Sequence, residues 1–339
     1  MSTSNTSISP LRKMQWLIRR ELWEHKGMLL WAPVLIGILM TVLGALLAAA
    51  TIAKTKARTA LTINGEDVSW SSLLNAKAFV QRKADLIDIV TNNYTYTASP
   101  LFLALGFLVF FYCLSALYDD RRDRSLLFWK SLPVSDVQTV LSKVAIALLV
   151  TPLIVLATAS LTSLVLLLIL AGILAAHDIW VFADLLKSPG LYLSPLQLFG
   201  LLPVYCLWAL PTVGWLLMVS SWARSKVFIW AVGLPLLLLV LAVWMGKLSQ
   251  MEVEFHWLQL NVIARSLLGT LPGSWYIFEP SLLPEMRAQA LAQGTTMANM
   301  SIFNNSWSSL ALPAAWLGAA AGAAMIYAAI RLRGWREED

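Results

Sequence analysis

The stretch "DDRRDRSLLFWKSLPVS", residues 119–135, lies between two long apolar runs and sets the organisation of the chain. Seven of its first twelve residues are charged, whereas the runs 100–118 and 144–176 on either side carry no charged residue. An α-helix needs about 20 predominantly apolar residues to cross the hydrocarbon core of a bilayer, and both runs provide them. The quoted stretch is therefore predicted to join two membrane-spanning helices.

The composition of the whole chain is typical of a membrane protein. Of its 339 residues, 58% are hydrophobic and 13% are charged, and the mean hydropathy is +0.70. A soluble domain usually carries about 25% charged residues. The formal net charge of +6 is interpreted as basic loops facing anionic lipid, and no nucleic-acid partner is expected. The two cysteines lie in separate apolar runs and the three histidines are scattered, so neither a disulfide nor a metal site is expected.

Six apolar segments are long enough to cross a membrane, and they predict an all-α, polytopic membrane protein with one permease domain over residues 1–339. The first segment is about 25 residues long, against about 7–15 for the core of a signal peptide, which favours a retained span. The third exceeds one perpendicular crossing, so we expect tilt, a kink at Pro152 or a helical extension there. The predicted spans are Met28–Ala53, Pro100–Tyr118, Val144–Ala176, Leu196–Trp222, Val227–Gly246 and Leu310–Ile330.

The distribution of Lys and Arg predicts the orientation of these spans. An even number of crossings places both termini on one side of the membrane. The loops on that side carry 15 Lys and Arg in 65 residues, against 10 in about 130 residues of the alternate loops. By the positive-inside rule, both termini are cytoplasmic, in a plasma (inner) membrane. The cytoplasmic segments are then 1–27, 119–143, 223–226 and 331–339. The larger external loops are 54–99 and 247–309, and a short external loop is expected around 186–195.

Two stretches of the external loops have an apolar pattern of their own. Residues 70–90 have the pattern of an amphipathic helix. Residues 255–278 are apolar but interrupted by Arg265 and by Pro272-Gly273. This second pattern predicts helices that lie in the membrane interface or dip into it, rather than a seventh span.

The predicted spans contain no Asp, Glu, Lys, Arg or His. Gradient-driven transporters usually need such groups near mid-membrane, and channels usually carry a charged ring or a filter sequence. Intramembrane enzymes need a nucleophile and base or paired metal ligands. The chain also has no glycine-rich phosphate loop, so it is not expected to hydrolyse nucleotide or to be an enzyme. Any uphill transport must therefore be driven by another protein from the cytoplasm.

The loop between the second and third spans offers a contact surface for such a protein. An apolar cluster, Leu126 to Trp129, is rimmed by charge and closed by Leu132-Pro133. Exposed clusters of this kind often mark docking surfaces, which Trp and Phe anchor. The alternative is a helix that rests on lipid headgroups, with Arg121, Arg122 and Arg124 as its anchors. These residues alone do not separate the two interpretations.

The loop resembles a motif of type-2 ATP-binding-cassette (ABC) exporter permeases. The similarity begins at Asp120-Arg121, continues through Ser125-Leu126 and Ser131–Ser135, and ends at Val140 and Lys143. The sequence departs from the family pattern at Asp123 and Arg124, where glycines would fall, and at Ser142. In that family the segment is a coupling helix that sits in a cleft of the ATPase subunit. The resemblance implies ATPase-coupling roles for Asp120, Arg121, Ser125, Leu126, Leu127, Phe128, Trp129, Leu132 and Pro133.

The layout of the rest of the chain is also similar to that family. The stretch "LRKMQWLIRRELWEHKG", residues 11–27, resembles the family's N-terminal interfacial helix, which lies on the cytoplasmic surface and touches the ATPase. The family's helical hairpin between spans five and six matches the apolar region 255–278. The interfacial-helix residues implied by the resemblance are Trp16, Arg19, Arg20, Glu21, Trp23 and Glu24.

These observations predict the membrane subunit of an ATP-driven exporter. Two copies, or this chain with a homologous permease, are expected to bind two cytoplasmic ATPase subunits that hold ATP-Mg, with membrane lipids around them and no cofactor in this chain. Gly318 and Gly322 allow close helix approach in the sixth span. Two alternatives stay open: a non-transporting membrane sensor or scaffold, and a gradient-driven carrier or channel. Candidate pathway residues are aromatic and favour a hydrophobic or amphipathic cargo: Tyr112, Tyr205, Trp208 and Trp215.

Overall fold

In the part of the chain that the structure describes, the fold is helical apart from one short hairpin. We analysed a computed structural model that describes residues 9–57, 61–63, 66–68, 87–122, 135–176, 180–249, 257–279, 282 and 302–335. Six of its helices are long and apolar enough to cross a membrane, as predicted, so the chain is a multi-pass membrane protein. The hairpin pairs strand β1 (Leu61–Ile63) antiparallel with strand β2 (Glu66–Val68).

The helices follow one another with few long connections among the described residues. Short π-helical (η1, η3, η4) and 3₁₀ (η2, η6) segments adjoin several of the α-helices. In chain order the helical elements are α1 (Pro10–Glu24), η1 (Gly27–Trp31), α2 (Ala32–Ala57), η2 (Tyr94–Ala98), α5 (Ser99–Arg122), α7 (Asp136–Ala145), η3 (Ile146–Val150), α8 (Thr151–Ala176), α9 (Phe182–Lys187), α10 (Gly190–Gly200), α11 (Leu202–Trp222), α12 (Val227–Ser249), η4 (Gln259–Ala264), α14 (Arg265–Leu268), α15 (Trp275–Phe278), α17 (Ile302–Ser308), η6 (Ser309–Ala311) and α18 (Pro313–Trp335).

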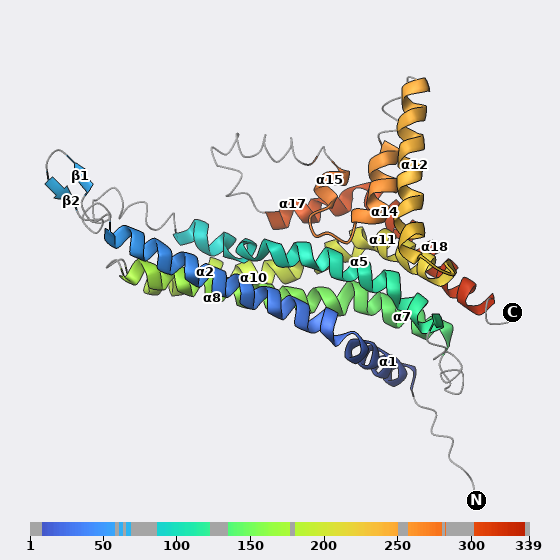
Figure 1. Cartoon of the computed structure of the whole chain (residues 1–339), viewed down its shortest axis with the longest axis horizontal. Helices are drawn as coiled ribbons and strands as arrows, with labels where there is room; N and C mark the ends of the chain where they lie inside the picture. The colour runs from blue at the N-terminus through green and yellow to red at the C-terminus, as the bar shows by residue number, and fades with distance from the viewer. Residues whose placement is uncertain are drawn as a thin grey trace, which may run out of the picture.

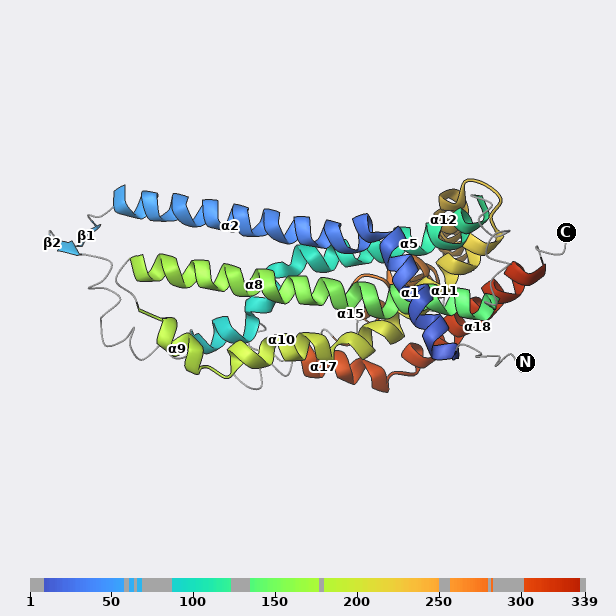
Figure 2. The same cartoon turned by 90° about the horizontal axis from the view of Figure 1, so that it is seen from below.

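The long helices form an elongated bundle. Helices α2, α5 and α8 run alongside one another (Figures 1 and 2), and α11 packs along α18 and α5. Helix α12 runs across the long axis of this bundle, and most of its apolar side chains are exposed (Figure 1). Helix α1 lies across the end of the bundle at which α7 begins and α18 ends (Figure 2).

Three spans begin well before their predicted first residues. The second begins at Ile87 and the fourth at Gly190, so the stretch 190–195, which was predicted to be loop, is helical. The third runs from Asp136 to Ala176, 41 residues, or about 60 Å at 1.5 Å per residue. It continues through Pro152, which lacks a backbone N–H and crowds the carbonyl four residues earlier. The π-helical turn η3 lies directly before this proline, where it accommodates the missing hydrogen bond.

Helices α11 and α18 are in close backbone contact. A Cβ atom added to Gly214 would lie 2.5 Å from the carbonyl oxygen of Gly322, and one added to Gly322 would lie 2.6 Å from the carbonyl carbon of Leu210. The close approach predicted for Gly322 is therefore present within one chain, against α11. Gly318 faces a different neighbour, the side chain of Arg265.

The region between spans five and six contains the predicted helical interruption. Segments η4 and α14 form one arm and α15 the other, and the chain turns between them at Gly273, whose φ of +84° suits glycine. Trp275 and Phe278 are buried. Within the described residues the hairpin thus packs on protein, and η4 and α14 contact α11, α12 and α18. Of the amphipathic helix predicted over 70–90, only the helical residues 87–90 lie among the described residues.

Candidate functional site

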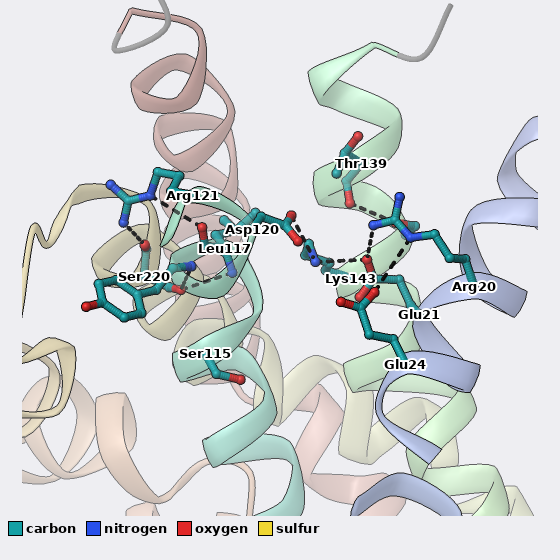
Figure 3. A network of polar contacts seen from close by, with 12 residues as sticks. Arg20, Glu21, Glu24, Ser115, Leu117, Asp120, Arg121, Thr139, Lys143 and Ser220 are labelled. Atoms are coloured by element: carbon teal, nitrogen blue, oxygen red, sulfur yellow. Dashed lines mark hydrogen bonds and ion pairs between the residues drawn. The ribbon is translucent and has the colours of Figure 1, made fainter. Parts of the chain in front are cut away.

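The two ends of the predicted coupling loop meet in a buried group of charges. Lys143, on α7, places its Nζ 3.2 Å from Oδ2 of Asp120, on α5, and 2.9 Å from Oε1 of Glu21, on α1 (Figure 3). The side chains of Lys143 and Glu21 are each only 1% exposed. Burying an ion pair is favourable only when its geometry and remaining hydrogen bonds are good, so this contact requires the three helices to keep their places.

The start of α7 is fixed by its own sequence. The side chain of Ser135 accepts a hydrogen bond from the backbone N–H of Gln138, and the Gln138 side chain accepts one from the backbone N–H of Ser135. This capping box satisfies two N–H groups at the start of the helix and fixes where it begins. Lys143 follows two helical turns later, on the face that packs against α1 and α5. Helix α7 and η3 form the first part of the third span and continue directly into α8.

Glu21 is the anion at the centre of the group. Besides Lys143, its carboxylate contacts the guanidinium of Arg20 at 3.0 Å, the Nε2 of His25 at 3.9 Å and the hydroxyl of Tyr112, which donates a hydrogen bond at 3.3 Å. Burial raises the pKa of Glu21, but the charges of Lys143, Arg20 and His25 together outweigh it and leave the pKa below its ordinary value. Glu21 is therefore a buried carboxylate at neutral pH.

Arg333 connects the C-terminal end of α18, the sixth span, to this group of charges. Its guanidinium lies 3.6 Å from Oδ2 of Asp120 and 3.0 Å from Oδ1 of Asp136, at the first position of α7. We call Glu21, Asp120, Asp136, Lys143 and Arg333 the end cluster. It ties α1, α5, α7 and α18 together at one end of the bundle.

Arg121 fastens α5 to α11 at the same end. Its guanidinium donates hydrogen bonds to the carbonyls of Ser220 and Ala223, and the hydroxyl of Ser220 accepts from the backbone N–H groups of Leu117 and Tyr118 at 3.1 and 3.0 Å. These carbonyls belong to the last turn of α11, where helix carbonyls lack partners and the helix dipole favours a cation. Arg121 thus supplies a positive charge and hydrogen-bond donors to the carbonyls at the C-terminal end of α11, in the fourth span.

The structure brings together only part of the predicted coupling motif. Asp120 and Arg121 form the contacts described above. The other residues of the motif lie outside the described residues: Ser125, Leu126, Leu127, Phe128, Trp129, Leu132 and Pro133. The end cluster and Arg121 therefore mark the attachment points of the segment 123–134.

The residues predicted for the N-terminal helix divide between two faces of α1. Glu21 faces the bundle with Leu17, and Arg20 and Glu24 lie beside it, joined by an ion pair of 3.7 Å. The remaining predicted residues are exposed and point away from the bundle: Trp16 at 63%, Trp23 at 61%, and Arg19. Helix α1 is thus amphipathic, with an aromatic and basic outer face.

The four candidate pathway aromatics lie in different surroundings. Tyr112 belongs to the surroundings of Glu21, and Tyr205 lines a cavity of about 180 Å³. Trp208 is fully buried beneath the guanidinium of Arg265, and its indole N–H donates to the hydroxyl of Ser309 at 3.1 Å. Trp215 lines a separate cavity of about 340 Å³.

Sequence reasoning missed several residues of these sites. Lys143 entered only as the end of a motif, and Asp136 and Arg333 were not singled out, because their partners come from distant parts of the chain. Arg265 was noted as an interruption of an apolar stretch, and that interruption was the available signal for a buried cation.

No protein-family model, no curated protein and no solved structure matches this chain significantly. Among the described residues, no group of His, Cys, Asp and Glu is arranged to hold a metal ion.

Proposed function

We propose that the chain is the membrane-spanning permease subunit of an ABC exporter, driven by separate cytoplasmic ATPase subunits. The observation that carries the proposal is the meeting of Asp120 and Lys143, 3.2 Å apart, with Glu21 of α1. Both ends of the segment 123–134 are thereby joined to the N-terminal helix and to the second and third spans. A protein that moves this segment moves the spans with it.

Two features of the sequence support the same proposal. The predicted spans contain no Asp, Glu, Lys, Arg or His, the residues that usually couple transport to protons or ions, and this favours energy from outside the membrane. The loop resembles the coupling motif of type-2 exporter permeases, and α1 has the amphipathic character expected of their interfacial helix. We propose that its exposed outer face, with Trp16, Arg19 and Trp23, lies on the cytoplasmic headgroups.

The proposed assembly has two permeases, either two copies or this chain with a homologue, above two ATPase subunits that bind ATP-Mg. Helix α12 supports it, because a helix of span length with mostly exposed apolar side chains needs lipid or a second permease around it. The proposed location is a plasma (inner) membrane with both termini cytoplasmic. ATP-driven closure of the ATPase pair would then displace the segment 123–134 and rock the spans as semi-rigid bodies.

The test is the double substitution Phe128→Ala and Trp129→Ala in the full chain, co-expressed with a candidate ATPase subunit, for which the neighbouring genes are the first place to look. Truncating an anchoring aromatic residue typically costs about 2 kcal/mol or more, so the complex should weaken well over tenfold. The matched control is Trp180→Ala with Phe182→Ala, which removes two exposed aromatics near the opposite end of the bundle. We expect the control to co-purify with the ATPase and to stimulate it, and the test variant to do neither while reaching the membrane at a normal level. Full partner binding and stimulation by the test variant would make Leu126–Trp129 a lipid anchor.

The orientation has its own test in a chain whose Cys113 and Cys206 are replaced by alanine. A cysteine introduced at Gln293 should react with an impermeant thiol reagent applied from outside, and one at Ser125 only after permeabilisation. The opposite labelling pattern would place the end cluster outside the cell and remove it from any cytoplasmic ATPase.

A further inference from the structure

A second buried charge lies away from the end cluster. Arg265, the first residue of α14, is 1% exposed, and its guanidinium stacks 4.2 Å above the ring of Trp208 on α11. Its Nη1 and Nη2 donate to the carbonyls of Ala314 and Ala315 at 2.6 and 3.4 Å. Its Nε is buried and has no hydrogen-bond partner. No described carboxylate forms an ion pair with it, although the charge of Glu279 acts on it electrostatically.

The surrounding backbone is shaped to hold this cation. A Cβ atom on Gly318 of α18 would overlap the guanidinium group, so only glycine leaves room for it there. The carbonyls of Ala314 and Ala315 lie in the first turn of α18, next to the end of the helix that carries a partial positive charge. Burial lowers the pKa of Arg265 to about 10, with Glu279 opposing the change, so the side chain stays charged at neutral pH. The region therefore carries a positive charge that no described carboxylate cancels by an ion pair.

Arg265 borders a cavity of about 340 Å³, which falls in the usual range of about 300–1,000 Å³ for ligand pockets. The cavity lies between α11, α12, α18 and the η4–α14 arm, where these elements gather in Figure 1. Its polar lining includes Asn261 and Ser266 beside Arg265, and the Oδ1 atom of Asn261 is also buried without a partner. The rest of the lining is predominantly apolar, including Trp215, Leu238 and Leu317.

One class of ligand matches this combination. An anion at this wall of the cavity would neutralise Arg265, since a charged acceptor makes the strongest hydrogen bonds with a guanidinium. An apolar tail would fill the space beside Trp215 and Leu238. A small inorganic anion would leave the apolar walls uncovered, and a neutral lipid would leave the buried cation uncompensated.

We propose that this cavity binds an anionic amphiphile, with a phosphate, sulfate or carboxylate head on Arg265 and an apolar tail between α12 and α18. The site belongs to this chain alone and does not depend on the ATPase proposed above. Such a molecule can come from the bilayer, as an acidic phospholipid, or reach the cavity as a separate amphiphile. The head chemistry is the same in both cases.

The probe for the test is octyl phosphate, titrated into the purified full chain in phosphatidylcholine nanodiscs while the unfolding temperature is followed. Octanol, which has the same tail without the anion, is the matched ligand control. We expect a saturable rise with octyl phosphate and none with octanol. Losing a charge-assisted hydrogen bond and its ion pair should weaken apparent binding about tenfold or more in Arg265→Gln. Arg224→Gln, which removes an exposed arginine, should behave as wild type.

A second variant keeps the test decisive if Arg265→Gln fails to fold. Ala321→Phe fills the cavity, which Ala321 lines, and leaves the cation in place. We expect it to abolish the response to octyl phosphate. An equal response of wild type and either variant, or an equal response to octanol, would overturn the proposal and leave Arg265 as a clamp on the carbonyls of α18.

Native mass spectrometry of the same protein after mild extraction identifies the source of the ligand, because it detects any phospholipid that stays bound. Acidic phospholipid retained by wild type and lost from Arg265→Gln supports the site with the bilayer as its source. Binding of octyl phosphate with no retained phospholipid supports the site with a separate amphiphile as its source. Acidic phospholipid retained equally by both proteins would place it elsewhere on the chain and contradict the proposal.

Discussion

Buried charge is compensated differently in the end cluster and beside the cavity that Arg265 borders. In the end cluster, Lys143 meets two carboxylates within 3.2 Å, and each carboxylate has a further cation beside it. At Arg265 a single cation is held by carbonyls, by the face of Trp208 and by the space that Gly318 leaves, next to an apolar cavity. A charge that the protein compensates itself serves as a joint between helices. A buried cation that has no ion pair within the described part of the chain, and that lies beside a cavity, has the properties of a binding site.

The same two helices connect these regions. Helix α11 carries Trp208 at the cavity and Ser220 at the other end, and α18 carries Gly318 at the cavity and Arg333 in the end cluster. Between the two regions, the backbones of α11 and α18 touch at Gly322. A ligand in the cavity and a partner at the end cluster would therefore act on one rigid pair of helices.

The largest expected effect is that of Lys143→Met. Removing one member of a buried ion pair leaves its partners desolvated and unpaired, which costs about 3–5 kcal/mol in the free energy of unfolding. Adding Glu21→Gln should recover part of this loss, because the double variant no longer buries that unpaired carboxylate. Unfolding in mixed dodecyl sulfate and maltoside micelles, followed by circular dichroism, measures both effects. The control is Lys187→Met, which changes an exposed lysine. If the losses from Lys143→Met and Glu21→Gln simply add, the two residues do not form a buried ion pair.

The second-largest expected effect tests the contact between α11 and α18 itself, apart from the two charged regions that these helices connect. In Gly322→Ala the new methyl group meets backbone atoms of α11 at about 2.6 Å, so the helices must move apart. Overpacking of this kind costs about 1–3 kcal/mol. Gly172→Ala, in α8 where a Cβ atom meets no neighbour, should be neutral or slightly stabilising in the same unfolding assay. Equal stability of the two variants would contradict the close contact of α11 with α18.

Arg121→Gln should have a smaller effect than either of these changes. It removes hydrogen bonds from a cation to the last carbonyls of α11, and a loss of about 1–2 kcal/mol is expected. Arg122→Gln changes the same charge on the neighbouring exposed residue and should leave the unfolding curve unchanged. If both substitutions behave alike, Arg121 does not hold α5 to α11.

The smallest effect concerns pH. The pKa of folded Glu21 lies below its ordinary value of 4.5, so folding favours the carboxylate form. Its contribution to stability is complete above pH 4.5 and is lost as the pH falls through the lower folded value. Relative to Glu21→Gln, the wild type should lose free energy of unfolding between pH 5 and pH 3 and show no such change between pH 7 and pH 5. A difference that stays constant down to pH 3 would contradict the pairing of Glu21 with Lys143.

The sequence was sufficient to predict the spans, because a run of about 20 apolar residues has few other uses in a protein. The limits of the fourth span were misplaced at Pro195, which was interpreted as part of a loop although it lies inside α10. A proline is tolerated in such a helix when neighbouring groups satisfy the backbone, and only the packed structure reveals this.

The two buried charged regions were harder to predict. Glu21 and Lys143 are 122 residues apart, and their contact depends on how α1 crosses the end of the bundle. From the local sequence alone, a charged residue beside a span is expected to face solvent. Arg265 interrupts an apolar stretch whose pattern predicted helices that lie in the membrane interface or dip into it, and this local pattern did not indicate that its side chain is buried under α18. Long-range packing, rather than local propensity, determines both sites.

The most direct test of the proposed function is the rate of ATP hydrolysis by a candidate ATPase subunit, measured alone and with this chain in proteoliposomes, with and without an uncoupler. We expect the chain to bind the ATPase and raise its rate, and the increase to persist when the ion gradient is abolished. A chain that leaves hydrolysis unchanged, or that moves solute only while an ion gradient is maintained, would contradict the assignment of an ATP-driven permease.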